Sequence, residues 1–190
     1  MALVLLPILP RLFETMEWTL ETPQTKNRSR WTGRTQVVGL PGAPYWTVNA
    51  TVQEIATEAQ ARKWRAFMAS LRGSENTFLM PALHTPQGSF VEPTVTANVA
   101  GGRQVDVNDA TNIAIGMHIS ILLTNGHYRL CVVVAKAVNR ISLEPELAGT
   151  AAAAAVRLNN PVSTMRMRQG QTSWVDSGGV GFTLDADEAL

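Results

Sequence analysis

The chain has 190 residues, of which 45% are hydrophobic and 16% charged, and its net charge is +1 at pH 7. This length suits one domain, or a small domain with a second one inserted in it, and the composition excludes an intrinsically disordered chain. The nearly neutral charge provides no overall field that would recruit nucleic acid or an anionic membrane. The charged fraction is low, as expected if neighbouring subunits cover much of the surface, although a stable monomer can also have it.

The first forty residues predict an apolar segment, a strand and a basic loop. Met1–Pro10 is apolar, but it lacks a positively charged start and contains two prolines, so it is not expected to be a secretory signal peptide. We expect it to act as an arm between subunits. Glu14–Leu20 alternates polar and apolar residues and predicts a strand. Four cations then follow without an acid, which predicts a solvated loop: Lys26, Arg28, Arg30 and Arg34.

The next elements are two strands, a helix and a further strand. Gln36–Val38 and Tyr45–Val52 predict strands of one hairpin, with Pro41–Pro44 as its turn. Thr57 and Gln60 have capping-box spacing. One face of the helix that follows is apolar, with Ala61, Trp64, Phe67, Met68 and Leu71. Gly73 is suited to end this helix, and Thr77–Leu83 predicts a strand.

The middle of the chain differs in composition from both ends. All five tryptophans and all five phenylalanines lie outside residues 91–161, where Tyr128 is the only aromatic residue. Short apolar runs separated by turns predict a small barrel or sandwich, and Asn125-Gly126 predicts a hairpin. We therefore expect residues 1–90 and 162–190 to form one discontinuous domain, with 91–161 inserted as an accessory domain.

Catalytic, cofactor-binding and metal-binding residues are not predicted. Cys131 is the only cysteine and lies in an apolar run, so it is expected to be a buried thiol. The three histidines lack metal-ligand spacing, the glycine pairs match no phosphate-binding loop, and two carboxylate pairs have turn contexts. These residues are His84, His118, His127, Gly101-Gly102, Gly178-Gly179, Glu144 with Glu146, and Asp106 with Asp109. A short acidic tail is expected at Asp185, Asp187 and Glu188.

Residues 30–88 carry a pattern that is similar to a known group of proteins. The pattern consists of a Pro-Gly hairpin tip before Tyr45-Trp46, the helix around Ala61–Phe67, then Leu71-Arg72-Gly73 and Asn76-Thr77-Phe78. Gly116–Ile119 and Ile141–Pro145 agree with it. The chain resembles distal tail proteins, and related tail-tip subunits, of long-tailed non-contractile bacteriophages.

The resemblance implies a mainly β fold: a split β-barrel or sandwich-type domain with one packed α-helix, and an inserted small β-barrel of oligonucleotide/oligosaccharide-binding (OB) type. It implies a structural virion protein without enzymatic activity, made in the host cytoplasm and located in the virion tail. Its expected partners are further copies in a homohexameric ring, as in the family, the tail tube protein, the tail-tip hub and other minor tail proteins, including the tape-measure protein. Neither specific nucleic-acid binding nor a membrane span is expected. The alternatives are a host-surface carbohydrate-binding module, another minor tail subunit, and a small tail-tip hydrolase.

Overall fold

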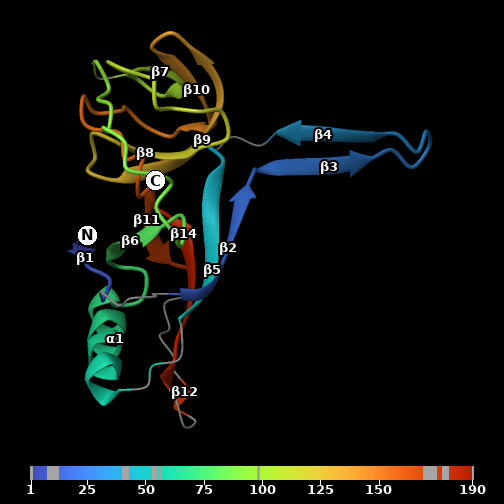
Figure 1. Cartoon of the computed structure of the whole chain (residues 1–190). Helices are drawn as coiled ribbons and strands as arrows, with labels where there is room; N and C mark the ends of the chain where they lie inside the picture. Colours follow the sequence, from blue (N-terminus) through green and yellow to red (C-terminus); the bar gives the residue numbers. More distant parts are fainter. Residues whose placement is uncertain are drawn as a thin grey trace.

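The computed structural model of the chain is mainly β, with one helix among the residues it describes (Figure 1). Those residues are 2–7, 13–39, 43–52, 55, 57–97, 99–168, 175–176 and 180–189. Within them the strands form a six-stranded sheet, a four-stranded sheet and two separate strand pairs. The prediction of a mainly β chain with one helix is confirmed.

The six-stranded sheet brings together both ends of the chain, in the order β1-β6-β11-β14-β5-β2. All neighbours are antiparallel except β1 and β6. The two strands after residue 160 lie between strands from the first half, so the chain cannot be cut into an N-terminal and a C-terminal half. The strands are β1 (Leu3–Val4), β2 (Phe13–Glu21), β5 (Tyr45–Val52), β6 (Thr77–Pro81), β11 (Val162–Met167) and β14 (Thr183–Glu188).

Helix α1 (Glu58–Leu71) packs its apolar face on this sheet. The Thr57 hydroxyl accepts a hydrogen bond from the Gln60 backbone N–H, so the predicted N-terminal cap is present. The five apolar residues predicted to share one face are all buried. Trp64 is fully buried and stacks on Phe182, with ring centroids 5.6 Å apart. Gly73 takes a φ of 66° just after the helix, as expected of a residue that ends it.

The four-stranded antiparallel sheet has the order β7-β10-β9-β8 and a core without aromatic side chains. The predicted Asn125-Gly126 hairpin is confirmed between β8 and β9, and Gly126 has a φ of 86°. One of the short apolar runs expected to be strands, Val156–Leu158, forms no named strand, although Arg157 bridges to Ser120. The strands are β7 (Gly102–Asp106), β8 (His118–Leu122), β9 (Tyr128–Ala137) and β10 (Arg140–Leu147).

Two apolar clusters form the interior. The first contains buried residues from 13–80 and 165–186, including Phe13, Trp64, Phe78 and Phe182. The second lies within 95–158 and consists of aliphatic residues and Cys131. The clusters differ in composition as the sequence does, while the boundaries proposed for the domains stay a prediction.

Three details of the sequence prediction are wrong. Gln36–Val38 does not pair with Tyr45–Val52, because it belongs to β4 (Thr35–Gly39), which pairs with β3 (Gln24–Arg28). The expected acidic tail is strand β14. The apolar start, expected to act as an arm between subunits, instead packs within its own chain over residues 2–7, since β1 pairs with β6 and Val4 packs on the first cluster. The Pro41-Gly42 turn residues, Gly178-Gly179 and Trp174 lie outside the described residues.

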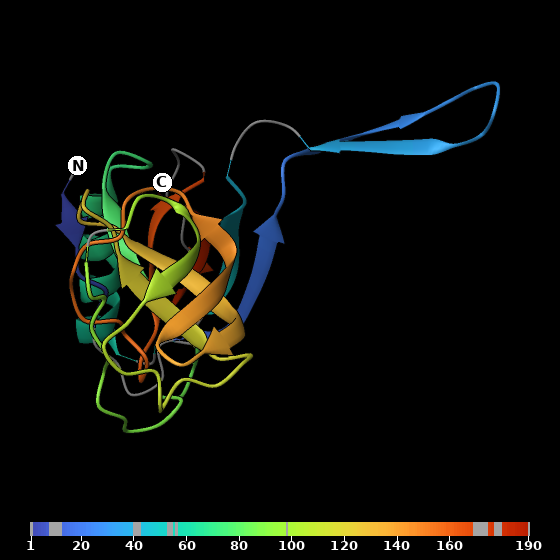
Figure 2. The ribbon, with the colours of Figure 1, turned by 90° about the horizontal axis from the view of Figure 1, so that it is seen from above.

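A short strand pair, β12 (Val175–Asp176) and β13 (Val180–Gly181), precedes β14. The remaining pair, β3 with β4, extends away from the rest of the chain in both ribbon views (Figures 1 and 2). We call this projecting hairpin, residues 24–39, the arm.

Candidate functional site

The arm is a regular hairpin that contributes nothing to either apolar cluster. Its five cross-strand pairs run from Gln24 opposite Gly39 to Arg28 opposite Thr35. Every side chain of the arm from 24 to 38 is exposed. An isolated two-stranded hairpin is at best marginally stable in water. A feature that adds no core and extends into solvent is therefore best explained by what it contacts outside its own fold.

The tip of the arm is held in a defined shape by hydrogen bonds within the loop. The Ser29 N–H donates to the Arg34 carbonyl at 2.9 Å, and the Gly33 N–H donates to the Ser29 carbonyl at 3.0 Å. The Thr32 N–H donates to the Ser29 hydroxyl at 3.2 Å. Gly33 has a φ of 66°, which glycine adopts without strain. The loop thus presents Trp31, 97% exposed, at the apex of the arm.

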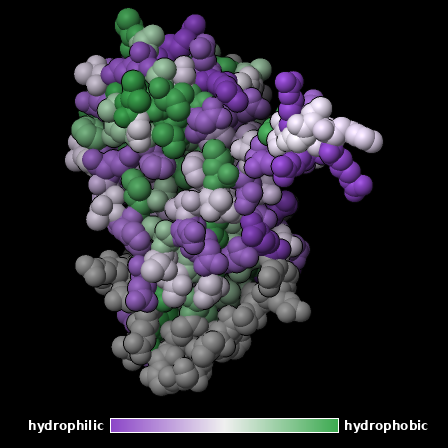
Figure 3. All heavy atoms as spheres, turned by 90° about the vertical axis from the view of Figure 1, so that its right-hand side faces the viewer, coloured by the Kyte–Doolittle hydropathy of each residue, from purple (hydrophilic) through white to green (hydrophobic). Residues whose placement is uncertain are grey.

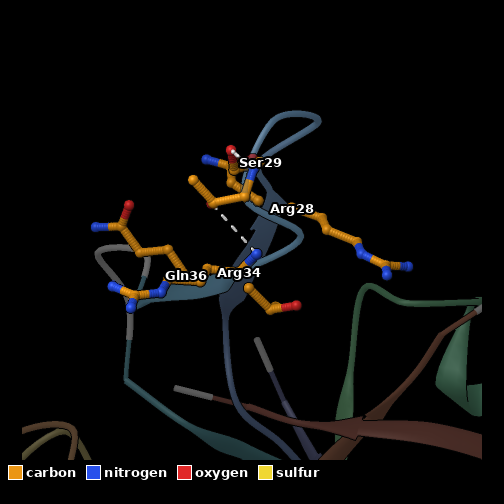
Figure 4. A pocket seen from close by; sticks show the side chains of 7 residues that line it. Arg28, Ser29, Arg34 and Gln36 are labelled. Atoms are coloured by element: carbon orange, nitrogen blue, oxygen red, sulfur yellow. Dashed lines mark hydrogen bonds between the residues drawn. The ribbon is translucent and has the colours of Figure 1, made fainter.

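A shallow hollow lies beside the tip (Figure 4). Arg28 and Gln36 point to opposite sides of the arm, and Arg34 lies on the same side as Gln36 (Figure 4). The lining contains two guanidinium groups, amides and hydroxyls, but neither a carboxylate nor an imidazole that could move a proton. It consists of Asn27, Arg28, Ser29, Thr32, Arg34, Thr35 and Gln36. Such a donor-rich lining suits the binding of carboxylates or other anions rather than acid–base catalysis.

The charge of the arm is of one sign. It contains four cations and none of the acids of the chain, namely Lys26, Arg28, Arg30 and Arg34. Figure 3 views the arm from its end, and its surface there is hydrophilic to intermediate. Val37 and Val38 add exposed apolar surface, at 54% and 42% exposure. Tryptophan and arginine are enriched where proteins contact each other, and the arm exposes Trp31 together with three arginines.

A second polar cluster, the junction, lies buried between the two sheets. The Arg129 guanidinium on β9 pairs with the Glu188 carboxylate on β14, and both side chains are almost fully buried. Glu188 also accepts hydrogen bonds from the backbone N–H groups of Trp46 and Leu130 and from the Ser163 hydroxyl, at 3.0 to 3.2 Å. Burial raises the pKa of Glu188, and the Arg129 charge and these three donors oppose that rise.

The junction connects the two sheets rather than forming a reaction site. Arg129 also donates to the backbone carbonyls of Pro44 and Glu146, so it joins three segments of the chain. The Trp46 indole N–H donates to the Leu130 carbonyl at 2.9 Å close by. Nothing in the described residues opens the junction to a substrate. Its polar groups bond to each other and to nearby backbone groups, apart from the buried Arg129 Nε, which has no hydrogen-bond partner among the described residues. We interpret it as a structural contact.

The residues examined in the sequence do not come together. Cys131 is fully buried and burial raises its pKa, which disfavours the reactive thiolate. His127 Nδ1 lies 3.0 Å from the Ala189 carbonyl, and burial lowers the pKa of His118. Among the described residues no three histidines, cysteines or carboxylates are placed to hold a metal ion.

Each carboxyl group of the two carboxylate pairs contacts an arginine or a backbone N–H group. Arg103 lies between Glu144 and Glu146, which belong to strand β10 rather than to a turn. Asp106 pairs with Arg140 on the neighbouring strand, and that hydrogen bond lowers the pKa of Asp106. Asp109 accepts a hydrogen bond from the Thr111 backbone N–H. None of these carboxyl groups faces another across a pocket.

Sequence patterns indicate neither the arm as a structure nor the junction. The cations of the arm lie in a stretch without apolar alternation, and such a stretch predicts a loop. Arg129 and Glu188 are 59 positions apart and give no local pattern. The one usable indication for the arm was its lack of acids, which distinguishes it from the mixed charge of an ordinary solvated loop.

Neither a scan against protein-family models nor a search of curated proteins finds a match for this chain. Over the described residues, no helix combines the length and the apolar character that crossing a membrane requires.

Proposed function

We propose that this chain is a structural subunit of a bacteriophage tail, of the distal-tail type that forms a ring between the tail tube and the tip hub. The observation that supports it best is the arm, a regular hairpin that is exposed throughout and has no role inside its own fold. Enzymes of this size build a pocket around polar groups. A ring subunit instead needs surfaces that reach its neighbours, and the arm is such a surface.

The resemblance supports the same proposal in part. The capped helix after strand β5, and the strand at Thr77–Pro81, have the expected order and packing. The Pro-Gly hairpin of that pattern is not formed as predicted, so it lends no support. Within this proposal the partners are further copies, six in a ring as the resemblance implies, the tail tube protein, the hub and other minor tail proteins, including the tape-measure protein. The ring leaves a channel for genome passage and belongs to the virion tail.

We further propose that residues 91–161 are an inserted small barrel of OB type on a split β-barrel or sandwich-type domain. The four-stranded sheet, with its own aliphatic cluster, supports this. Isolated bridges such as Val99 to Ala151 and Leu123 to Ala151 extend the pairing beyond the named strands. The named strands do not close into a barrel over the described residues.

A carbohydrate-binding module is the alternative that the insert could offer. Sugar-binding surfaces expose aromatic rings, and Tyr128 is the only aromatic residue of the insert. The Arg157 guanidinium covers its ring, 4.5 Å from the centroid. One face of that ring is therefore already occupied, and no observation favours this alternative.

The proposed function is tested by measuring the mass of the purified protein in solution, with negative-stain images of the same sample. We expect rings of uniform size, six subunits if the resemblance holds. If the protein stays a monomer at high concentration, and neither purified tail tubes nor hub protein induces rings, the ring proposal is wrong. A glycan-binding screen on that monomer then tests the carbohydrate alternative.

A further inference from the structure

Among the described side chains, most of the unpaired charges lie in two places. Among the acids whose side chains the structure describes, only three take part in no hydrogen bond or ion pair, and all three lie on strand β2: Glu14, Glu17 and Glu21. Among the described cations, six have neither such a partner nor a ring contact, and four of these are the cations of the arm. The other two are Lys63 and Arg166. Unpaired positive charge thus lies on the arm, and unpaired negative charge lies on β2.

Strand β2 is also an open edge. It is the last strand of the six-stranded sheet, and among the described strands it pairs with β5 alone. Its outer row of backbone N–H and C=O groups can therefore accept another strand or hairpin. The opposite edge is β1, which is only two residues long. The face of β2 that carries Thr15, Glu17 and Glu21 is exposed, so it remains free for a partner.

The arm cannot satisfy β2 of its own molecule. Only Thr22 and Pro23 separate β2 from β3, and the arm turns outward there, away from the sheet (Figures 1 and 2). The rest of the chain, without the arm, has twelve cations against fifteen acids, so it is acidic overall. A second molecule of the same chain therefore offers the basic arm a complementary acidic edge.

We propose that the arm of one copy docks along the open β2 edge of a second copy, with its cations facing Glu14, Glu17 and Glu21 and Trp31 buried at the contact. Such a contact joins two different surfaces head to tail. Repeated contacts of this type produce a closed ring, or an open filament if the rotation does not close. The inference rests on the proposed function for the ring, but the pairing of arm and edge can be tested separately from it.

Cross-linking tests the contact directly. One chain carries Arg28→Cys and a second carries Glu17→Cys, and the two are mixed with a short bismaleimide. The native Cys131 is fully buried and remains unreactive. We expect a cross-linked dimer when the reaction is run at low salt. When it is run in 0.5 M NaCl we expect no dimer, because salt screens the exposed charges that form the contact. A matched mixture of Lys63→Cys with Glu17→Cys, in which the cation lies on helix α1, is expected to give no cross-link.

Charge reversal tests whether the cations of the arm meet the acids of β2. Lys26→Glu with Arg28→Glu, or Glu17→Lys with Glu21→Lys, is expected to raise the dissociation constant of self-association about tenfold or more, since like charges then face each other. Mixing the two reversed chains should restore association, because the acidic arm of one meets the basic edge of the other. The control is Lys63→Glu with Arg166→Glu, which makes the same charge change outside the arm and should leave association unchanged.

The outcomes separate this inference from the proposed function. Rings that form without the arm-to-edge cross-link would overturn the inference and leave the ring subunit in place. Cross-linked open filaments would support the inference and count against a closed ring. If no cross-link forms at any concentration, and wild-type protein instead binds a DNA or RNA duplex that the Lys26→Glu, Arg28→Glu chain does not bind, the arm is a nucleic-acid contact and the inference is wrong.

Discussion

The arm and the hairpin β8–β9 are built alike but lie in opposite surroundings. Each pairs five residues with five, and each has a glycine with positive φ in its loop, Gly33 and Gly126. In β8–β9 the side chains of Ile119, Ile121 and Cys131 are fully buried, whereas the arm buries none from 24 to 38. The same strand pairing therefore occurs in both hairpins, but only the β8–β9 hairpin is held by buried side chains.

This difference shows what each hairpin contributes. The apolar side chains of β8–β9 stabilise the fold from inside the chain, since burial of apolar surface is the main favourable contribution to folding. The side chains of the arm remain in water, so their identity has little effect on the stability of the isolated fold. Their effect is expected in association, and the predictions below separate the two effects.

The largest effect is expected at Arg129, where β9 contacts the junction. Arg129→Met removes the charge partner of buried Glu188 and should lower the free energy of unfolding by about 3–5 kcal/mol. Urea denaturation of the two proteins measures this loss. The matched control is Arg103→Met on β7, whose ion pairs with Glu144 and Glu146 are exposed, and which should cost less than about 1 kcal/mol.

A second change at the same place distinguishes a structural junction from a mere packing defect. Adding Glu188→Gln to Arg129→Met removes the unpaired buried charge, while the amide oxygen can still accept hydrogen bonds from Trp46, Leu130 and Ser163, so part of the lost stability should return. If Arg129→Met alone costs no more than Arg103→Met, the interpretation of the junction as the structural contact between the sheets is wrong.

The next prediction compares the two hairpins directly. Ile121→Ala on β8 removes buried methyl groups and should lower the free energy of unfolding by about 2–5 kcal/mol. Val37→Ala on the arm changes an exposed side chain and should alter it by no more than about 0.5 kcal/mol. Both values come from urea denaturation at a protein concentration low enough to keep the chain monomeric. A large loss at Val37 would mean that the arm packs on its own chain.

The sequence predicted the parts of the fold whose pattern is local. Helix α1 has a cap at Thr57 and an apolar face around Trp64, and both lie within one stretch of chain. The β8–β9 hairpin is indicated by Asn125-Gly126 between two apolar runs. In each case the side chains that face the core repeat at the period of the element, so the sequence alone contains the information.

The arm and the junction could not be predicted in this way. The arm faces water on both sides, so no apolar alternation marks its strands, and the valines of β4 suggested a pairing with β5 instead. Glu188 resembles a tail residue until β14 is placed between β11 and β5. The proposed contact between the arm and β2 could not be predicted either, because it depends on which other charges are already paired in the fold.

The smallest effect is expected from pH, and it again involves β8–β9. Burial lowers the pKa of His118, at the start of β8, below its usual 6.5. The unfolded chain therefore binds this proton more tightly than the folded chain does. Protonation of His118 therefore lowers the free energy of unfolding as the pH falls from about 6.5 through the lower pKa of the folded state. Well above pH 6.5 this loss is absent and the full stability is present. The arm contains no histidine.

The measurement compares wild type with His118→Gln by urea denaturation between pH 5 and 8. His84 and His127 are present in both proteins, so their titration cancels in the difference of the two free energies of unfolding. We expect that difference to be constant above about pH 7 and to shift against the wild type below about pH 6.5. A difference that stays constant down to pH 5 would mean that His118 is as solvated in the folded chain as in the unfolded one.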